Sequence, residues 1–390
     1  MDALMLPLNW QRVRLGDIAE INPPTIIPNV FYYIDLENVE KGQLLNKQLM
    51  TKNKAPSRAR RLLSKNDILY QLVRPYQRNN YFFTLNGNYV ASTGYAQIRT
   101  LQNPSFLYFA LHSNYFVNAV LDRCEGTSYP AISSNELKKC EVILPPLNEQ
   151  IAIANILSTL DRYLYALDAL ILKKEGVKKA LSFELLSQRK RLKGFNQAWQ
   201  RVKVKDFGII ITGSTPLTQI SEYWNGTISW ITPTDINDNK DIFNSERKIT
   251  QKGLDTIRMI PKNSVLVTCI ASIGKNAILR VNGACNQQIN AIIPNKDFNA
   301  DFIYYLMENN KQYLLGKAGV TATYIISKQV FEEIDFFVPK DLNEQSAIAN
   351  ILSALDNEIA SLKNKKRQFE NIKKTLNHDL MSAKIRVLKK

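Results

Sequence analysis

Residues 147–161 read LNEQIAIANILSTLD, and residues 342–356 read LNEQSAIANILSALD. Thirteen of these fifteen positions are identical, which is far more than chance produces in a chain of this length. The match continues without a gap at an offset of 195 residues, because VKKAL at 177–181 answers IKKTL at 372–376. One unit is therefore present twice in tandem.

The segments in front of the two blocks also correspond, although more loosely. The matches follow the same order in both copies: WQRVRLGD at 10–17 with WQRVKVKD at 199–206, KNDIL at 65–69 with KNSVL at 262–266, and FLYFAL at 106–111 with FIYYLM at 302–307. We therefore expect globular and helical regions to alternate. The expected boundaries are 1–146 and 195–341 for the globular regions, and 147–194 and 342–390 for the helical ones.

Both helical blocks carry apolar residues at the alternating spacing of four and three that is typical of a coiled coil. The two seams are Ile153, Leu157, Leu160, Leu164, Leu167, Ile171, Leu181 and Leu185, and Ile348, Leu352, Leu355, Ile359, Leu362, Phe369, Leu376 and Leu380. Lysines interrupt both: Lys174 and Lys178, and Lys366 and Lys373. Matching seams predict that the helices pair as an antiparallel coiled coil. The alternative is two independent amphipathic helices, each packed on its own globular domain.

The globular regions combine short β-type runs with helices, so we predict an α+β fold with two α/β domains in tandem. Residues 67–73 and 264–270 are apolar runs bounded by turn formers. Asn86-Gly87, between 81–85 and 89–91, is typical of a two-residue β-hairpin. Helices are expected at about 104–122 in the first copy and at 299–315 in the second.

Composition favours a polyanionic partner. The 390 residues include 51 Lys and Arg against 35 Asp and Glu, which gives a net charge of +16. The four cysteines form no C-x-x-C pair and are expected to be reduced. No apolar segment approaches the roughly 20 residues that a membrane span needs, and the first nine residues do not resemble a secretion signal. We expect a soluble, cytoplasmic protein.

Catalytic motifs fail on inspection. Asn22-Pro23-Pro24-Thr25 lacks the aromatic residue with which adenine methyltransferases stack on a flipped base. Gly274-Lys275 lacks the remaining positions of a phosphate-binding loop. Asp235 with Glu246-Arg247-Lys248 has the residue types of a metal-dependent nuclease core, but such a triplet is common by chance. The two histidines, His112 and His378, support neither a zinc site nor a catalytic triad. We predict a binding protein that holds no metal.

Candidate DNA contacts cluster in the first copy. A basic run suited to phosphates is followed by residues that can also read or stack on bases. The candidates are Lys52, Lys54, Arg58, Arg60, Arg61, Arg74, Tyr76, Gln77 and Arg78. In the second copy the candidates are Lys248, Lys252 and Lys275, with the amides Asn286, Gln287 and Gln288, of which we expect one to contact a base. The alternative for each is an ordinary solvated side chain.

These features together resemble the specificity subunits of type I restriction-modification systems, over essentially the whole chain. The most specific elements are Leu144-Pro145-Pro146-Leu147-Asn148-Glu149-Gln150 and Val338-Pro339 with Leu342-Asn343-Glu344-Gln345. Residues 229–236, 271–275 and 285–288 look like landmarks of one class of the family's target recognition domains. One departure is Lys340-Asp341, where the first copy has Pro146 alone before its leucine.

The resemblance implies that each globular domain reads one half of a bipartite, asymmetric target in double-stranded DNA. It also implies that the paired helices separate the two readers and dock the methyltransferase and restriction subunits. Asn148, Glu149 and Gln150, with Asn343, Glu344 and Gln345, are the expected partner-binding residues. S-adenosylmethionine, ATP and Mg²⁺ would then belong to the partners and none to this chain. The alternatives are a reader for a modification-only or combined nuclease-methylase system, and a nucleic-acid scaffold without sequence preference.

Overall fold

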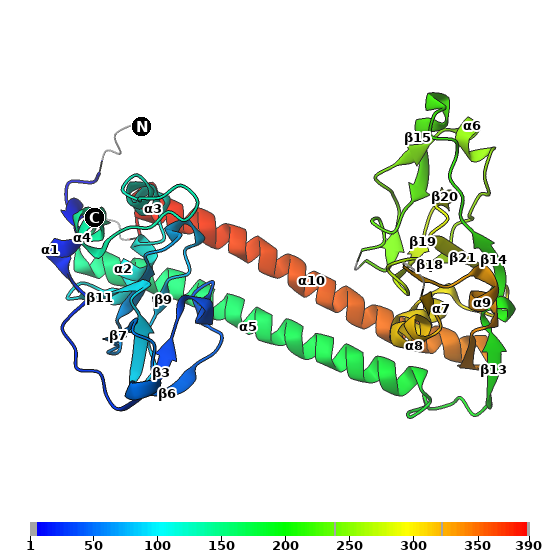
Figure 1. The fold of residues 1–390 in the computed structure, drawn as a ribbon, viewed down its shortest axis with the longest axis horizontal. Helices are drawn as coiled ribbons and strands as arrows, with labels where there is room; N and C mark the ends of the chain where they lie inside the picture. The colour runs from blue at the N-terminus through cyan, green and yellow to red at the C-terminus, as the bar shows by residue number, and fades with distance from the viewer. Residues whose placement is uncertain (1–5, 238, 321–322, 388–390) are drawn as a thin grey trace. The chain divides into compact units, whose positions relative to one another are not determined.

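The computed structural model describes residues 6–237, 239–320 and 323–387, and the chain divides into two compact units. Unit 1 consists of Met1–Ala169 with Asn364–Lys390, and unit 2 consists of Leu170–Lys363. The division passes through the middle of both long helices, so that each unit contains one globular domain and a piece of each helix (Figure 1).

The first domain consists of two four-stranded sheets, with strand orders β6-β3-β10-β7 and β2-β11-β8-β9, and the pair β1-β12. Helices α2 and α3 pack on the second sheet in the main apolar core. The strands are β1 (Gln11–Arg14), β2 (Ala19–Ile21), β3 (Val30–Ile34), β4 (Val39–Glu40), β5 (Gln43–Leu44), β6 (Gln48–Thr51), β7 (Ala59–Leu62), β8 (Ile68–Gln71), β9 (Tyr81–Phe82), β10 (Tyr89–Ser92), β11 (Tyr95–Thr100) and β12 (Glu141–Leu144). The helices are α1 (Leu15–Ile18), α2 (Pro104–Ala110), α3 (Asn114–Leu121) and α4 (Ser134–Lys139).

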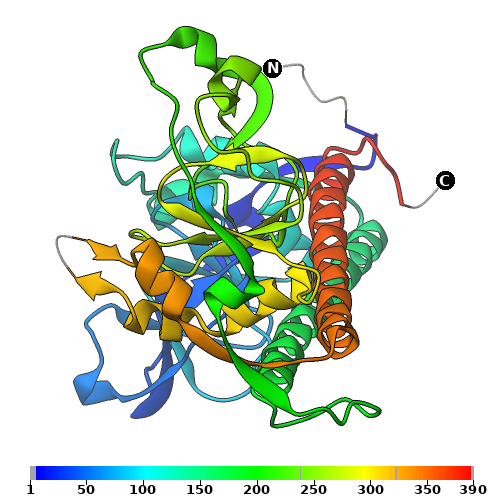
Figure 2. The same ribbon diagram turned by 90° about the vertical axis from the view of Figure 1, so that its right-hand side faces the viewer.

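The second domain repeats this plan with sheets ordered β14-β21-β18-β19-β16 and β17-β15-β20, the pair β13-β24 and the small hairpin β22-β23, which projects from the domain in Figure 2. Its strands are β13 (Trp199–Lys203), β14 (Gly208–Thr212), β15 (Trp224–Ile231), β16 (Asp241–Ile242), β17 (Lys248–Ile249), β18 (Ser264–Thr268), β19 (Asn276–Leu279), β20 (Gly283–Cys285), β21 (Ile289–Pro294), β22 (Gly319–Val320), β23 (Tyr324–Ile325) and β24 (Asp335–Pro339). Its helices are α6 (Gln251–Leu254), α7 (Ala300–Asn309), α8 (Lys311–Gly316) and α9 (Lys328–Glu333).

Strand pairing confirms the duplication at the level of register. Each domain has a corresponding parallel pair, with Tyr89 opposite Tyr32 in the first and Trp230 opposite Ala284 in the second, and the second domain has a further parallel pair, β16 with β19. The central strands also have corresponding neighbours: β8 lies between β11 and β9, and β18 lies between β21 and β19. The two domains therefore share one fold, as the sequence predicts.

Three local predictions need correction. Residues 81–85 and 89–91 do not form a hairpin, because β9 pairs with β8 and β10 pairs with β3 and β7, in different sheets. The Asn86-Gly87 turn instead connects the two sheets, and Gly87 adopts a φ of 110°. The helix expected at 104–122 is divided into α2, which ends at Ala110, and α3, which Ser113 caps by accepting a bond from the Phe116 amide at its hydroxyl oxygen. The helix expected at 299–315 is likewise divided, into α7 and α8.

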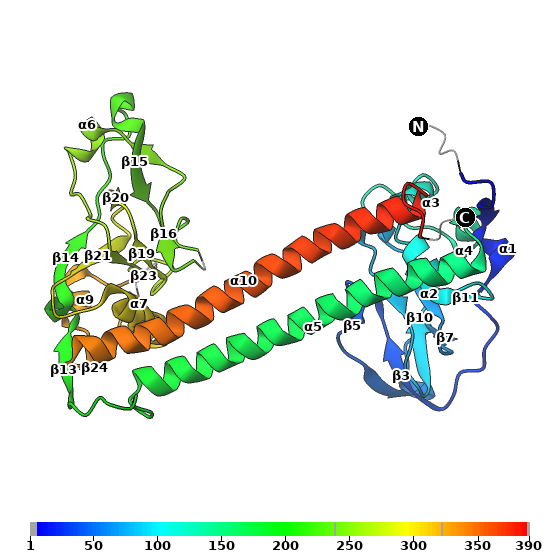
Figure 3. The same ribbon diagram turned by 180° about the vertical axis from the view of Figure 1, so that it is seen from behind.

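The long helices are α5 (Leu147–Leu186) and α10 (Leu342–Met381), and both begin at the leucine where the repeated block begins. They lie side by side and antiparallel within each unit (Figures 1 and 3). In unit 1 Tyr163 packs on Phe369, with ring centroids 4.7 Å apart. The helices pair with each other, so the alternative of independent helices is wrong.

The lysines that interrupt the seams bind carboxylates of the opposite helix. In unit 2 Lys174 contacts Glu358 at 2.8 Å and Lys178 contacts Asp356 at 2.5 Å. In unit 1 Lys366 contacts Asp168 at 2.6 Å, and Lys373 is paired with Asp161. Such pairs contribute little stability when they are exposed, but they fix the alignment of one helix on the other. Among the described residues no helix is long and apolar enough to span a membrane.

Candidate nucleic-acid interface

Four loops of the first domain meet at the edge where its central strands end. The amide of Leu72 donates to the carbonyl of Gly94 at 3.0 Å, and the amide of Thr93 donates to the carbonyl of Arg58 at 2.8 Å. The amide of Arg74 donates to the carbonyl of Pro130 at 2.7 Å. We call the residues 22–25, 72–80, 93–94 and 125–131 the first loop edge.

The second domain has an equivalent edge, formed by residues 213–216, 269–275, 286–288 and 323–326, which we call the second loop edge. The amide of Cys269 donates to the carbonyl of Gln288 at 2.8 Å, and that of Ser214 donates to Cys285 at 2.8 Å. The amide of Ala271 donates to the carbonyl of Tyr324 at 3.0 Å, as Arg74 does to Pro130. Loops are the usual place for binding residues on a rigid scaffold.

The same position of both edges is held in the left-handed backbone region by a residue other than glycine. Arg74 has a φ of 55° and Ala271 has a φ of 61°. Side chains with a Cβ rarely adopt this conformation, and its cost, of order 1–3 kcal/mol, is typically retained at functional sites. The shared backbone conformation singles out the loops after β8 and β18.

An arginine and two exposed tyrosines lie on the first loop edge. The guanidinium of Arg74 lies over the ring of Tyr129, with 4.2 Å from its carbon to the ring centroid. Tyr129 is 62% exposed and Tyr76 is 50% exposed, so both rings can contact a ligand. Tyr129 did not stand out in the sequence, because it lies 55 residues from Arg74 and only the fold brings them together.

The predicted residues after β8 divide into two groups. Tyr76 is exposed and Arg74 is half-buried on the same loop, and for both the DNA contact stays a prediction. Gln77 is exposed, but its amide oxygen accepts a bond from Gln71 Nε2 at 3.0 Å. Arg78 is half-buried and donates to the carbonyl of His112, so its guanidinium is held within unit 1. We therefore withdraw Arg78 from the candidate base readers.

The basic run of the first domain is spread over both ends of one sheet. Lys52 and Lys54 are exposed near the start of β3, where the Lys52 amide donates to Asn29. Arg58 lies at the opposite end, beside Thr93, and pairs with Asp35 at 2.5 Å. The run does not form the single patch that its sequence suggests.

Arg60 and Arg61 differ because neighbouring residues of a strand point to opposite faces. Arg60 is exposed and its Nε donates to the carbonyl of Ser57 at 2.7 Å. Arg61 is half-buried, its Nε lacks a hydrogen-bond partner, and burial lowers the pKa of its guanidinium. Arg60 is therefore the better placed of the two for a phosphate.

Among the three amides of the second domain, Gln287 alone is exposed. Its Oε1 accepts from the hydroxyl of Thr215 at 2.6 Å. Asn286 is buried and donates to Gln288 Oε1 at 2.9 Å, so these two amides fix the turn. Of the three amides, Gln287 is therefore the candidate for the predicted base contact. Lys275 is also exposed, in the neighbouring loop.

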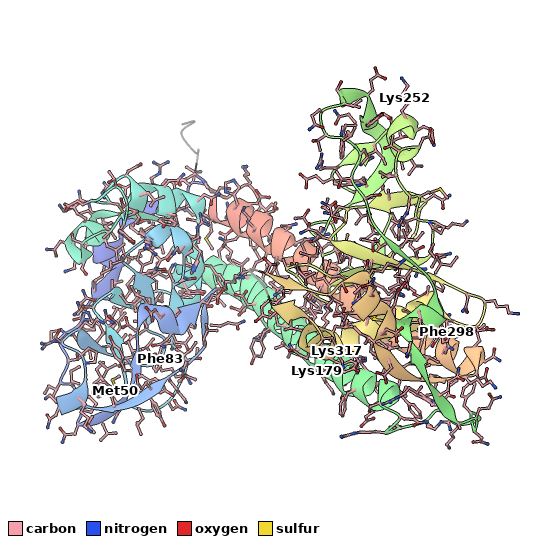
Figure 4. The ribbon with its side chains drawn as sticks, turned by 45° about the vertical axis from the view of Figure 1, so that its right-hand side comes forward. Met50, Phe83, Lys179, Lys252, Phe298 and Lys317 are labelled. Atoms are coloured by element: carbon pink, nitrogen blue, oxygen red, sulfur yellow. The ribbon has the colours of Figure 1, made fainter. Side chains whose placement is uncertain are left out.

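The other predicted lysines of the second domain lie on the extension formed by β15, β17 and α6. Lys252 is at its tip (Figure 4) and pairs with Glu222 at 2.6 Å. Lys248 pairs in register with Ser229. Sequence reading missed Arg247 here, whose guanidinium carbon lies 4.1 Å from the ring centroid of Trp224 and 4.8 Å from that of Trp230.

The nuclease-like triplet is a structural turn. Asp235 accepts from the backbone amides of Thr232 and Glu246, each at 2.8 Å, and from the hydroxyl of Thr232. Both of its carboxylate oxygens are therefore occupied by the chain itself. Across the described parts of the chain, no group of three potential metal-ligating side chains comes together.

The Asn-Glu-Gln motif that begins each long helix attaches that helix to its own domain. Glu149, which is 2% exposed, accepts from the indole nitrogen of Trp10 at 3.1 Å and from Arg386 at 2.7 and 2.9 Å. Glu344, which is 1% exposed, accepts from Trp199 at 3.2 Å and from Arg191 at 2.9 Å. The same clamp is therefore built twice.

The glutamines complete the attachment. Gln150 donates to Pro145 and accepts from the amide of Asn103, while Gln345 donates to Pro339 and accepts from the amide of Asn299. The side chains of Glu149, Gln150, Glu344 and Gln345 are buried and bonded within the chain, so they are not available for direct contact with a partner in this structure. Only Asn148 and Asn343 are exposed, and for these two the role stays a prediction.

The chain matches a known protein family twice. Residues 7–174 and 196–371 both match the model of the type I restriction modification DNA specificity domain. A relative from Methanocaldococcus jannaschii, the type I restriction enzyme MjaIX specificity subunit, is 36% identical over 182 residues, which are 45% of this chain and 41% of that protein. The HindI specificity subunit of Haemophilus influenzae is 25% identical, over 85% of this chain and 90% of that protein.

Solved structures share the fold. A type I restriction-modification S subunit from M. genitalium superposes with a TM-score of 0.62 at 16% identity, covering 96% of this chain and 98% of that one. The HsdS subunit of Thermoanaerobacter tengcongensis gives 0.51 at 21% identity, over 97% and 98% of the two chains. With two family domains that together span most of its length, this chain belongs to the type I restriction modification DNA specificity family.

Proposed function

We propose that this chain is the DNA-reading specificity subunit of a type I restriction-modification enzyme. One observation carries the proposal: the chain contains the family's DNA specificity domain twice, and each copy has a loop edge with a different set of exposed groups. Arg74, Tyr76 and Tyr129 are available on the first edge, and Gln287 and Lys275 on the second. Arginine pairs well with guanine and glutamine with adenine, so the two copies should read different bases.

The target is therefore bipartite and asymmetric, and the surplus of 16 positive charges supports attachment to its backbone. The two rigid clamps support a second role, in which α5 and α10 hold each reader at a fixed orientation to its helix. We propose that methyltransferase and restriction subunits dock on this assembly and carry the catalytic steps. S-adenosylmethionine, ATP and Mg²⁺ would be bound by those partners.

Methylation mapping tests the proposal. The chain is expressed with its methyltransferase partner in a host without other such systems, and methylated adenines are located genome-wide. We expect one bipartite motif that disappears when either chain is omitted. Arg74→Ala should relax only one half of the motif and Gln287→Ala only the other, because a good side-chain contact to a base gives about 1–3 kcal/mol of discrimination.

Lys296→Ala is the matched control, since Lys296 is an exposed cation of the second domain that lies outside both loop edges and is not among the predicted DNA contacts. The motif should be unchanged in this variant. A methylation pattern that is the same without this chain would contradict the proposed function. A variant of either edge that relaxes both halves together would contradict the assignment of one half to each domain.

A second prediction concerns phosphate contacts on the first domain. Arg60→Ala should lower the slope of log affinity against log salt by about 0.9, the value for one lost phosphate contact, because Arg60 is exposed. Arg61→Ala should leave the slope unchanged, because that guanidinium is half-buried. Fluorescence anisotropy with a duplex carrying the mapped motif measures both. An Arg60→Ala slope equal to that of the wild type would show that Arg60 makes no phosphate contact.

A further inference from the structure

A cavity of about 290 Å³ lies within unit 1, between the first domain and the last part of α10. Helix α3 lies beside this end of α10 (Figures 1 and 3). The wall is contributed by the loop after β8, the region around α2 and α3, the turn after β4 and one face of α10. Its residues are Lys41, Gln77, Arg78, Tyr108, Phe109, His112, Asn114, Glu370, Lys373, Lys374, Asn377 and His378.

Positive charge dominates this wall. Lys41, Arg78, Lys373 and Lys374 face a single carboxylate, Glu370. Lys373 is paired with Asp161, and Glu370 lies 3.6 Å from Lys366. Within the described part of the chain, neither Arg78 nor Lys374 has a carboxylate at ion-pair distance. Neither group therefore has a carboxylate partner of its own, and the cavity carries an excess of positive charge.

Arg78 is the best defined of these groups. Its Nη1 donates to the carbonyl of His112 at 2.9 Å, and its Nη2 donates to Asn114 Oδ1 at 2.8 Å. Both acceptors are neutral, and burial lowers the pKa of the guanidinium. Placing a partly buried cation without a counter-ion is costly, so a fold retains it chiefly where an anion binds.

The second copy of the domain provides an internal comparison. In the first copy the amide of Asn80 lies 3.4 Å from Nε2 of His112. In the second copy the equivalent amide, that of Asn276, donates at 2.9 Å to a carboxylate, Glu308, which is also paired with Lys311 at 2.5 Å. The second copy therefore supplies its own anion at the position where the first copy has an imidazole.

His112 stays neutral in this place. Its Nδ1 donates to the carbonyl of Tyr108 at 2.7 Å, and burial lowers the pKa of the ring to about 4. The arginine itself is a second difference between the copies. Counted back from the equivalent Asn80 and Asn276, the residue that corresponds to Arg78, which has a φ of 56°, is Gly274, which has a φ of 81°, a conformation that suits glycine. The first copy thus keeps a strained arginine where the second has the unstrained residue.

The size and polarity of the cavity define a ligand class. Pockets that bind small molecules have volumes of roughly 300 Å³ or more. The cavity of about 290 Å³ is therefore near that size and larger than a bare ion requires. Guanidinium and ammonium groups bind phosphate oxygens through charge-assisted hydrogen bonds. Asn377 on α10 also lines the cavity, and its buried Oδ1 has no hydrogen-bond partner within the chain.

We propose that this cavity binds a phosphate group, with Arg78 and Lys374 as its main ligands. The phosphate can belong to a small phosphorylated molecule such as a nucleoside monophosphate, or to the DNA backbone. The proposal does not depend on the proposed function, because the cavity lies wholly within unit 1 and its test with free ligands involves no sequence recognition.

The test uses the full chain and isothermal titration calorimetry at constant ionic strength. Inorganic phosphate and AMP are the probes, and chloride is the reference anion. The informative variant is His112→Glu, which introduces the carboxylate that the second copy already accommodates beside the same asparagine. We expect it to weaken phosphate and AMP binding at least tenfold, because the new carboxylate neutralises Arg78.

Two further variants keep the test decisive if His112→Glu fails to fold. Lys374→Gln changes an exposed residue of α10 and should weaken binding several-fold, whereas Lys296→Gln, in the other domain, should have no effect. If free probes do not bind but His112→Glu and Lys374→Gln each lower the salt slope for duplex DNA by about 0.9, the phosphate belongs to DNA.

Other results would overturn the proposal. The proposed phosphate site is wrong if the wild-type protein binds neither free probe and the variants leave the DNA salt slope unchanged. The same follows if the variants bind phosphate as well as wild type does. Loss of methyltransferase docking as the only effect would show that an acidic side chain of a partner, and no phosphate, occupies the cavity.

Discussion

Replacing Glu344 by alanine is expected to destabilise unit 2 by about 3 kcal/mol, the usual cost of breaking a buried ion pair by removing one partner. Glu344 is 1% exposed and accepts hydrogen bonds from Arg191 and from the indole nitrogen of Trp199. The substitution leaves a cation and an indole donor without their acceptor, and it opens space at the point where α10 meets its domain. The domain should therefore lose both stability and its fixed orientation to the helix.

Urea unfolding followed by tryptophan fluorescence measures this effect, because Trp199, Trp224 and Trp230 lie in unit 2 and only Trp10 lies in unit 1. Asn343→Ala is the matched control: it is the adjacent residue of the same motif, it is exposed, and it should change the free energy of unfolding by less than about 0.5 kcal/mol. Equal losses in the two variants would show that the clamp does not hold unit 2 together.

This clamp also illustrates which features a sequence can predict. The duplication, the start of both long helices and their pairing follow from identity and periodicity, which are properties of the chain read in order. The role of Glu149 and Glu344 does not, because their partners Arg386 and Arg191 lie 237 and 153 residues away. A repeated Asn-Glu-Gln motif at a helix start suggests a shared surface, yet here its glutamates and glutamines are buried.

The other wrong predictions from the sequence have the same cause, which is that the contacts join residues far apart in the chain. Asn86-Gly87 has the residues of a hairpin turn, but β9 and β10 find their partners in separate sheets, and turn chemistry cannot specify that choice. Lys174 and Lys366 interrupt the apolar seams in sequence, whereas across the helix pair they meet Glu358 and Asp168. A basic run in sequence does not imply one basic surface, because β7 directs Arg60 and Arg61 to opposite faces.

The second prediction concerns the distance between the half-sites. The chain passes from one unit to the other only at Ala169–Leu170 and Lys363–Asn364, in the middle of α5 and α10. Duplicating residues 163–169 in α5 together with residues 364–370 in α10 adds one heptad to each helix. The duplicated blocks face each other, since they contain the pairs Tyr163–Phe369 and Asp168–Lys366, so the seam and its ion pairs are preserved.

Seven residues lengthen an α-helix by roughly 10 Å, and one base pair advances duplex DNA by about 3.4 Å. Methylation mapping of this variant with its partner should therefore show the spacer enlarged by two or three base pairs and the original motif lost. Both half-site sequences should be retained, because neither loop edge is changed. The control duplicates residues 163–169 in α5 alone, which leaves the added seam unpaired and should abolish methylation. An active double duplication with the original spacer would refute the role of the paired helices as a ruler, since DNA recognition would then not depend on their length.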